Sequence, residues 1–168
     1  LFKEDLCKQG ANFCNKIWNA FRLVQGWQAA DIDQPLSSAK AIDWMQAKVR
    51  AEVAEIDDLY SKYRLNEALM TAFKLFTDEF SGWYLEMVKP AYQAPIDRKT
   101  LQATLQIFED LMKVIHPFMP FITEEIYQHI TERAEGESIM TSVLTLEAPN
   151  QADAALLASM EQAKQIIR

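Results

Sequence analysis

Residues 111–130, LMKVIHPFMPFITEEIYQHI, decide how this chain folds, because they predict a helix, a sharp corner and a second helix. Pro117 should end the first helix near His116, since a proline pushes the residue before it out of the helical region. Pro120 can begin the next helix, where its missing N–H costs nothing. Thr123, followed by two glutamates, is an alternative start, because a hydroxyl can cap a helix and acidic residues are favoured in its first turn.

The corner between these two helices is apolar, which predicts that it is packed under other elements. The side chains expected to be covered are Phe118, Met119, Phe121 and Ile122. A buried proline corner fixes how two helices meet, so the remaining helices must fit around it.

Further helices are predicted on both sides of the corner, from apolar residues that recur at helical spacing. The predicted helices are residues 3–26, a helix from Ser37 or Ser38, residues 67–88 with Asn66 as the cap, a helix from Asp97 or Thr100, a helix ending near Glu132, and residues 151–167. Residues 133–150 are expected to form an irregular tail across the bundle or one short strand. Helices joined by short loops pack as antiparallel neighbours, so the fold class is an all-α, up-and-down helical bundle.

The amphipathic pattern of these helices predicts which side chains form the core. In the first helix the inward stripe is Leu6, Phe13, Ile17, Phe21 and Val24. In the last helix the expected stripe is Leu157, Met160, Ala163 and Ile167.

The length of 168 residues suggests one helical domain over residues 1–148, followed at residues 149–168 by the start of a further helical segment that is cut off. Because the first residue is Leu, we expect the chain to be an excised piece of a longer protein. No apolar run approaches the length of a membrane span, so no membrane partner is expected.

Two cysteines, Cys7 and Cys14, lie in the first predicted helix. A separation of seven residues at about 1.5 Å per residue puts their Cα atoms roughly 10 Å apart, too far for a disulfide. We therefore expect free thiols near the core and a cytoplasmic location.

The sequence contains no glycine-rich phosphate loop, no Cys/His cluster with metal-ligand spacing and no nucleophile motif. His116 precedes a proline at a helix end, where its imidazole can bond a free carbonyl. The adjacent Glu124 and Glu125 fit the charges of a helix start. The chain therefore carries no recognisable catalytic apparatus of its own.

A polar face on the first helix is the strongest candidate for a binding surface. It consists of Asn12, Asn15, Lys16, Asn19 and Arg22. Amides and cations of this kind suit base edges and phosphates. An ordinary solvated helix face is the alternative, and the pattern alone favours it.

Bundle geometry strengthens the functional interpretation, because the first and third helices of an up-and-down bundle end at the same pole. This pole should gather Lys16, Asn19, Arg22, Trp83, Tyr84, Glu86 and Lys89. Unpaired RNA bases are bound by such a mixture, through stacking and through contacts to their edges. Trp83 and Tyr84 could instead continue the aromatic core stripe of their helix.

Three stretches together resemble the anticodon-binding domain of class I aminoacyl-tRNA synthetases of the valine, isoleucine and leucine group. They are residues 12–20 (NFCNKIWNA) followed by Arg22, residues 80–86 (FSGWYLE) followed by Lys89 and Pro90, and residues 116–126 (HPFMPFITEEI). The resemblance covers roughly residues 5–135, and the first stretch is most similar to the valine members of the group.

The resemblance implies a parent enzyme of protein biosynthesis that attaches valine to its tRNA with ATP and magnesium. The nucleotide-binding motifs of the family lie upstream of this domain and do not occur here, so no cofactor is expected in this fragment. The implied partners are the tRNA anticodon stem-loop and the catalytic domain of the parent chain.

The same resemblance implies roles for four residues of the first helix. Lys16 and Arg22 are expected to bind phosphates or base edges of the anticodon loop. Asn19 is expected to hydrogen-bond a base, and Leu23 to offer an apolar platform for one.

Two residues of the third helix complete the expected site. Glu86 can accept a hydrogen bond from the exocyclic amine of adenine or cytosine, and Lys89 can meet a phosphate. One alternative is the same domain of an isoleucine or leucine enzyme. Another is a protein–protein scaffold without RNA binding, which the net charge of −7 and the charged face of the second helix favour. That face consists of Lys48, Arg50, Glu52, Glu55, Asp57 and Asp58.

Overall fold

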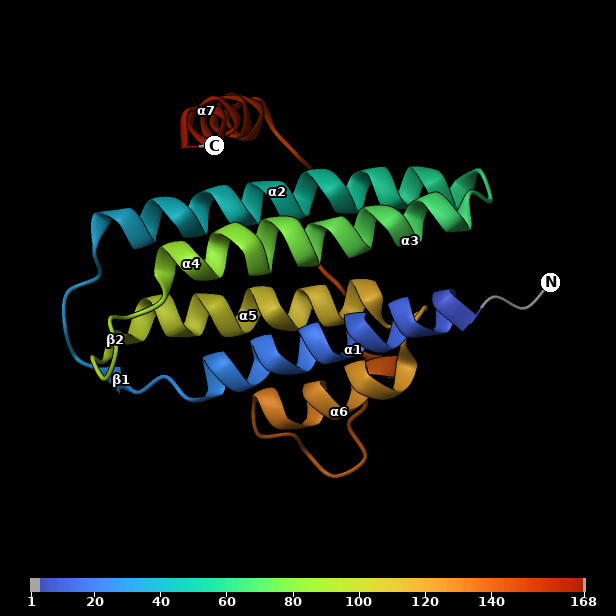
Figure 1. Cartoon of the computed structure of the whole chain (residues 1–168), viewed down its shortest axis with the longest axis horizontal. Helices are drawn as coiled ribbons and strands as arrows, with labels where there is room; N and C mark the ends of the chain where they lie inside the picture. The colour runs from blue at the N-terminus through green and yellow to red at the C-terminus, as the bar shows by residue number, and fades with distance from the viewer. Residues whose placement is uncertain (1–3, 168) are drawn as a thin grey trace.

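The computed structural model describes residues 4–167, apart from the side chain of Leu6. Its helices run alternately in opposite directions and pack side by side, as Figure 1 shows. They are α1 (Glu4–Gln25), α2 (Leu36–Ser61), a composite third helix of α3 (Leu65–Lys74), η1 (Leu75–Tyr84) and α4 (Leu85–Val88), then α5 (Arg98–Ile115) and α6 (Pro120–Ile130). The predicted all-α, up-and-down bundle is confirmed.

The proline corner between α5 and α6 forms as predicted, because α5 ends at Ile115 and Pro120 begins α6. Thr123 is not a cap, since it lies inside α6 and is fully buried. Its hydroxyl donates to the Met119 carbonyl oxygen at 2.8 Å, so the His116 Nδ1 that lies 2.7 Å from the same hydroxyl is the donor in that contact. The imidazole therefore bonds a side chain of the next helix, and the prediction that it bonds a free carbonyl was wrong.

The apolar corner is covered only in part. Phe118 is half-buried, and its ring stacks on Tyr60 of α2 with centroids 6.2 Å apart. Phe121 is 90% exposed, so the prediction that it is packed was wrong. The reason is the phase of α6, whose inward face carries Ile126 and Ile130 and leaves Phe121 on the opposite side.

The core stripe predicted for α1 is confirmed at Phe13, Ile17, Phe21 and Val24, all of which are buried. The side chain of Leu6, the remaining member, lies outside the described residues. Around this stripe the core is aromatic, and edge-to-face contacts join rings of different helices, which is a favourable arrangement.

Three fully buried rings form the centre of that aromatic core. Phe108 of α5 meets Phe76 and Phe80 of η1 at centroid distances of 5.8 and 5.2 Å. These contacts hold the third helix against α5.

The third helix contains a ten-residue π-helical segment, η1, which the sequence did not predict. Hydrogen bonds from i to i+5 widen the turn beyond the 3.6 residues of an α-helix, so residues four apart fall closer to one line. Phe76, Phe80 and Tyr84 have this spacing and are all fully buried. The third helix also begins at Leu65 without a side-chain cap, so the prediction of Asn66 as its cap was wrong.

Two short strands join the loops at one end of the bundle. They are β1 (Ala29–Ala30) and β2 (Ile96–Asp97), which pair in parallel. Asp97, one of the two predicted starts of α5, is confirmed as its cap, because the Asp97 carboxylate accepts a hydrogen bond from the Thr100 amide at 2.8 Å. Within the described part of residues 133–150 no strand forms, and the segment is irregular apart from the short helix η2 (Ile139–Thr141).

The last helix, α7 (Gln151–Ile167), has the predicted bounds and crosses α2 on the outer side of the bundle, where Figure 1 shows it end-on. Near its start, the Asp153 carboxylate receives two hydrogen bonds from the Arg50 guanidinium, at 2.6 and 2.9 Å. Near its end, the buried ammonium of Lys164 pairs with Glu79 and lies 4.7 Å from the centre of the Trp44 ring.

The position of α7 corrects two predictions. The charged face of α2 is not fully solvated, because Lys48, Arg50 and Glu52 are half-buried. The stripe predicted for α7 holds at its half-buried members, Leu157, Met160 and Ala163, but fails at Ile167, the last residue of α7, which is 71% exposed. Helix α2 also begins earlier than predicted, at Leu36, with Pro35 at the cap position.

Both cysteines are free thiols. Cys14 is half-buried, whereas Cys7 is exposed, because it lies in a part of α1 where residues 7–12 are all exposed. The predicted position near the core was therefore wrong for Cys7.

Candidate nucleic-acid interface

The carboxyl-terminal ends of α1 and α4 lie at the same end of the bundle, together with β1 and β2 (Figure 1). We call this end the strand pole. The prediction that the first and third helices end at one pole is confirmed. The opposite end carries the turn between α2 and α3.

A groove of about 620 Å³ lies at the strand pole. One wall is the end of α1 with the residues after it, and the other is the loop that follows α4. The lining residues are Arg22, Leu23, Gly26, Trp27, Gln28, Pro90, Ala91, Tyr92, Gln93 and Ala94. Arg22 is the charged side chain among them, so the groove is locally positive although the chain carries a net charge of −7.

Local sequence explains both walls. Helix α1 ends where the Gly26 amide bonds back to the Arg22 carbonyl at 3.1 Å and the chain turns away. Pro90 cannot continue α4, which ends at Val88. The two walls are joined below the groove, because the Ile96 amide donates to the Gln28 carbonyl at 2.9 Å.

The loop wall carries a tight turn over residues 91–94, closed by a hydrogen bond from the Ala94 amide to the Ala91 carbonyl at 2.9 Å. Gln93 has φ of +60°, and Tyr92 is 92% exposed. Sequence reasoning missed these two residues. Pro90 and Pro95 are typical of a loop, but nothing in the sequence places that loop opposite the end of α1.

The four predicted site residues of α1 are all exposed on one side of the helix. Arg22 and Leu23 line the groove, and Leu23 is 44% exposed. Lys16 and Asn19 lie about one to two turns earlier on α1 and do not line it. They extend the polar surface from the groove along the helix.

The two predicted residues of the third helix, Glu86 and Lys89, pair with each other at 2.5 Å on the surface of the strand pole. Neither lines the groove, which begins at the next residue, Pro90. Exposed ion pairs of this kind contribute about 0–1 kcal/mol, so the pair can open at little cost to contact another molecule.

Trp83 and Tyr84 belong to the core and not to the interface. The Tyr84 ring is fully buried, and its hydroxyl bonds the Thr104 hydroxyl at 2.8 Å. Burial raises the pKa of Tyr84 to about 12. Trp83 is half-buried beside Lys164 of α7, with the ammonium 5.5 Å from the ring centre.

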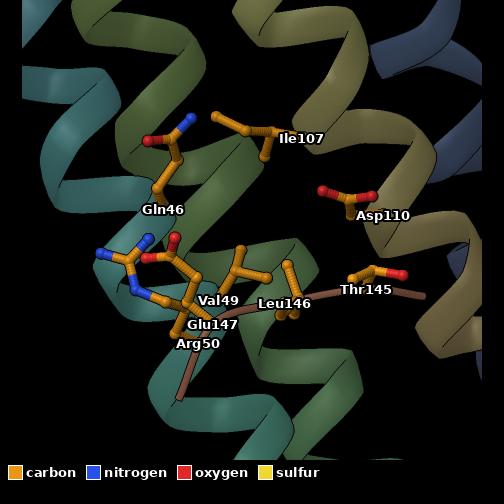
Figure 2. A pocket seen from close by; sticks show the side chains of 8 residues that line it. All are labelled: Gln46, Val49, Arg50, Ile107, Asp110, Thr145, Leu146 and Glu147. Carbon is orange, nitrogen blue, oxygen red and sulfur yellow. The ribbon is translucent and has the colours of Figure 1, made fainter. Parts of the chain in front are cut away.

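A second pocket, of about 300 Å³, lies where the connection to α7 crosses α2 and α5. Figure 2 shows its lining side chains, which are Gln46, Val49, Arg50, Ile107, Asp110, Thr145, Leu146 and Glu147. The Arg50 guanidinium already forms an ion pair with Asp153. Burial raises the pKa of Asp110. The pocket belongs to the contact that holds α7 and lies outside the groove of the strand pole.

Within residues 4–167 no three acidic, histidine or cysteine side chains are arranged to hold a metal ion. Over the same residues, no helix combines the length and apolarity that a membrane crossing requires.

Fold and surface together define an all-α helical bundle with a polar, aromatic-lined groove at one pole, an arrangement suited to unpaired nucleic acid. The sequence profile of a family described as "Anticodon-binding domain of tRNA ligase" matches residues 43–168. The chain belongs to this family of anticodon-binding domains.

Its relatives include valine–tRNA ligases of several bacteria. The chain is 53% identical to those of Phocaeicola vulgatus and Parabacteroides distasonis over 99% of its own length. It is 30% identical to the valine–tRNA ligase of Fusobacterium nucleatum, again over 99% of its length. The chain spans only 19–20% of the length of these relatives.

Proposed function

We propose that this chain is the anticodon-binding domain of a valine–tRNA ligase and that its strand pole binds the anticodon stem-loop. The family match and the high identity to valine–tRNA ligases support this assignment. The parent enzyme attaches valine to tRNA in the cytoplasm. It binds ATP and magnesium in its catalytic domain, outside the residues of this chain.

The position of Arg22 is the observation on which the proposal mainly rests. It is exposed on the last turn of α1, lines the groove, and is the cation of its wall. A guanidinium in this position can contact a phosphate or the edge of a base in the anticodon loop. Lys16 and Asn19 extend the contact along α1, and Leu23 offers an apolar surface to a base.

Glu86 and Lys89 are proposed to meet the RNA on the other side of the pole. The Glu86 carboxylate accepts from the exocyclic amine of adenine or cytosine, and Lys89 turns to a phosphate. Because their mutual ion pair is exposed, separating the two side chains is inexpensive.

The test is a titration of the chain with a valine-tRNA anticodon stem-loop at two salt concentrations, with a leucine-tRNA stem-loop as the competitor. Trp27, half-buried in the groove wall, serves as the fluorescent reporter. We expect binding that prefers the valine stem-loop and weakens with salt, because phosphate contacts release counterions.

Arg22→Ala should lower the affinity at least about tenfold, since hydrogen bonds to charged groups contribute roughly 1.5–3 kcal/mol. Arg64→Ala is the matched control, because Arg64 is an exposed arginine at the opposite pole. Equal losses in the two variants would contradict the placement of the site at the strand pole.

Two other outcomes would replace the proposal. Preference for the leucine stem-loop would assign the chain to another member of the same enzyme group. Absence of RNA binding at both salt concentrations would favour a protein scaffold. The scaffold hypothesis is weaker than the sequence suggested, because α7 covers part of the charged face of α2.

A further inference from the structure

We propose that the turn formed by residues 91–94 is a base-reading element, in which one unpaired base stacks on Tyr92 and the Gln93 amide bonds its edge. This inference rests on the proposed function, since it assigns a specific contact within the RNA site. It adds two residues on the loop wall, across the groove from Arg22.

The first argument is the exposure of Tyr92. Its side chain is 92% exposed although it borders the groove, so the ring contributes little to the packing of the bundle. An aromatic plane in this position is available to a base, and stacking of this kind tolerates any base because each has a π-face.

The second argument is the backbone of Gln93. The turn is closed between Ala91 and Ala94, and its third residue has φ of +60°. A turn with positive φ at this position favours glycine or asparagine, because other side chains are strained there. Stability alone would therefore favour glycine, whereas the chain carries a glutamine. Strain of this kind gathers at ligand-binding sites, where the surrounding structure holds it in place.

The surroundings of the turn do hold it. Pro90 precedes it, Pro95 follows it, and the Ile96 amide is bonded to the Gln28 carbonyl. Each proline fixes its own φ, so the loop has few alternative conformations. The Tyr92 ring and the Gln93 amide are therefore presented at a defined place on the rim.

The chemistry of the groove favours a base over other ligands. Its walls offer an aromatic plane, a side-chain amide with both a donor and an acceptor, and the guanidinium of Arg22. Unpaired bases are bound by the same three groups, which stack on the base, bond its edge and contact the adjacent phosphate. A volume of about 620 Å³ is ample for one base.

The experiment measures binding of the valine anticodon stem-loop to four variants of the chain. Tyr92→Ala should weaken binding about tenfold, whereas Tyr92→Phe should bind like the wild type because it keeps the ring. Gln93→Gly relieves the positive φ, so it should keep the fold and most of the affinity. It should lose discrimination between stem-loops that differ at a single anticodon base.

Tyr63→Ala is the matched control. Tyr63 is 90% exposed and has φ of +57°, but it lies at the turn between α2 and α3, at the opposite pole. We expect this variant to bind like the wild type. Unfolding midpoints of all four variants show whether each substitution leaves the bundle intact.

The outcomes separate this inference from the proposed function. If Tyr92→Ala binds like the wild type while Arg22→Ala is weakened, the base-reading turn is wrong and the RNA site stands. If Gln93→Gly retains full base discrimination, the role of Gln93 is wrong. If the wild-type chain binds neither stem-loop, the proposed function fails and this inference fails with it.

Discussion

Two tyrosine hydroxyls inside the bundle differ in whether they have a hydrogen-bond partner. The Tyr84 hydroxyl bonds Thr104, whose own proton goes to the Thr100 carbonyl at 2.8 Å, so Tyr84 is the donor. The Tyr60 hydroxyl is enclosed without a hydrogen-bond partner among the described residues, and burial raises the pKa of Tyr60. An enclosed polar group without a partner costs stability, whereas a bonded one contributes.

Replacing each tyrosine by phenylalanine should therefore act in opposite directions. Tyr60→Phe should be neutral or should raise the free energy of unfolding by up to about 1 kcal/mol. Tyr84→Phe should lower it by about 1–2 kcal/mol, because Thr104 loses its donor. Urea unfolding of both variants checks this, and an equal loss in the two would show that the Tyr60 hydroxyl has a partner.

At the residue scale, site residues on a helix could be found from the sequence more readily than site residues on a loop. Arg22 and Leu23 could be placed because helical spacing gives the face of α1 and chain topology gives its end. Tyr92 and Gln93 could not, because their position across the groove depends on how the loop is tied to Gln28. Phe121 was misplaced because apolarity alone does not give the phase of a helix that begins at a proline.

Among the elements, the π-helical segment η1 has a close backbone approach at Gly82. A Cβ atom at this residue would lie 3.2 Å from the Thr77 carbonyl oxygen, five residues earlier. This approach is close, and a backbone oxygen in the π-helical turn cannot move without altering the turn. Gly10 in α1 is the comparison, since an added Cβ there meets nothing within 4 Å beyond its chain neighbours and the nearby backbone of α1 itself.

Gly10→Ala should stabilise the chain by about 0.5–1 kcal/mol, the usual difference between the two residues inside a helix. Gly82→Ala should show none of this gain, and should lower the free energy of unfolding instead. Thermal unfolding of both variants measures the difference. A similar gain at the two glycines would mean that the η1 turn adapts freely.

Element boundaries were predictable where local chemistry sets them. Pro120 begins α6, Asp97 caps α5, and the apolar period gave the bounds of α7. The switch from α to π hydrogen bonding in η1 was not predictable, because the aromatic spacing of Phe76, Phe80 and Tyr84 fits an ordinary α-helix as well. The pairing of β1 with β2 was also missed, since each strand has only two residues and no strand-like composition.

For the whole molecule, the attachment of α7 depends on ionised side chains. Hydrogen bonds from Arg50 hold the pKa of Asp153 below its usual range, and Arg50 in turn has a raised pKa from the same contact. A carboxylate whose pKa is lowered on folding stabilises the folded state at pH values above its unfolded pKa, which is about 3.9. That contribution is lost as the pH falls through the lower pKa of the folded state.

Acidification below about pH 4 should therefore loosen α7. Asp153→Asn should lower the hydrogen-exchange protection of α7 amides at pH 7 and reduce its further loss on acidification. Asp57→Asn, at an exposed carboxylate of α2, is the control and should leave α7 unchanged. Unaltered protection in Asp153→Asn would show that the contacts of Lys164 suffice to hold the helix.

The pairing of β1 with β2 has a consequence for the kinetics of recognition. The four paired residues connect segments that are more than sixty positions apart and fix the distance between the two walls of the groove. Ordering a flexible loop costs about 1–2 kcal/mol per residue, and here that entropy is lost when the chain folds rather than when the RNA arrives. In the proposed binding mode, the RNA therefore meets a backbone that is already in place. The rearrangements on binding in this mode are those of exposed side chains, such as the Glu86–Lys89 pair, and of the RNA loop, whose bases would leave their own stack to enter the groove.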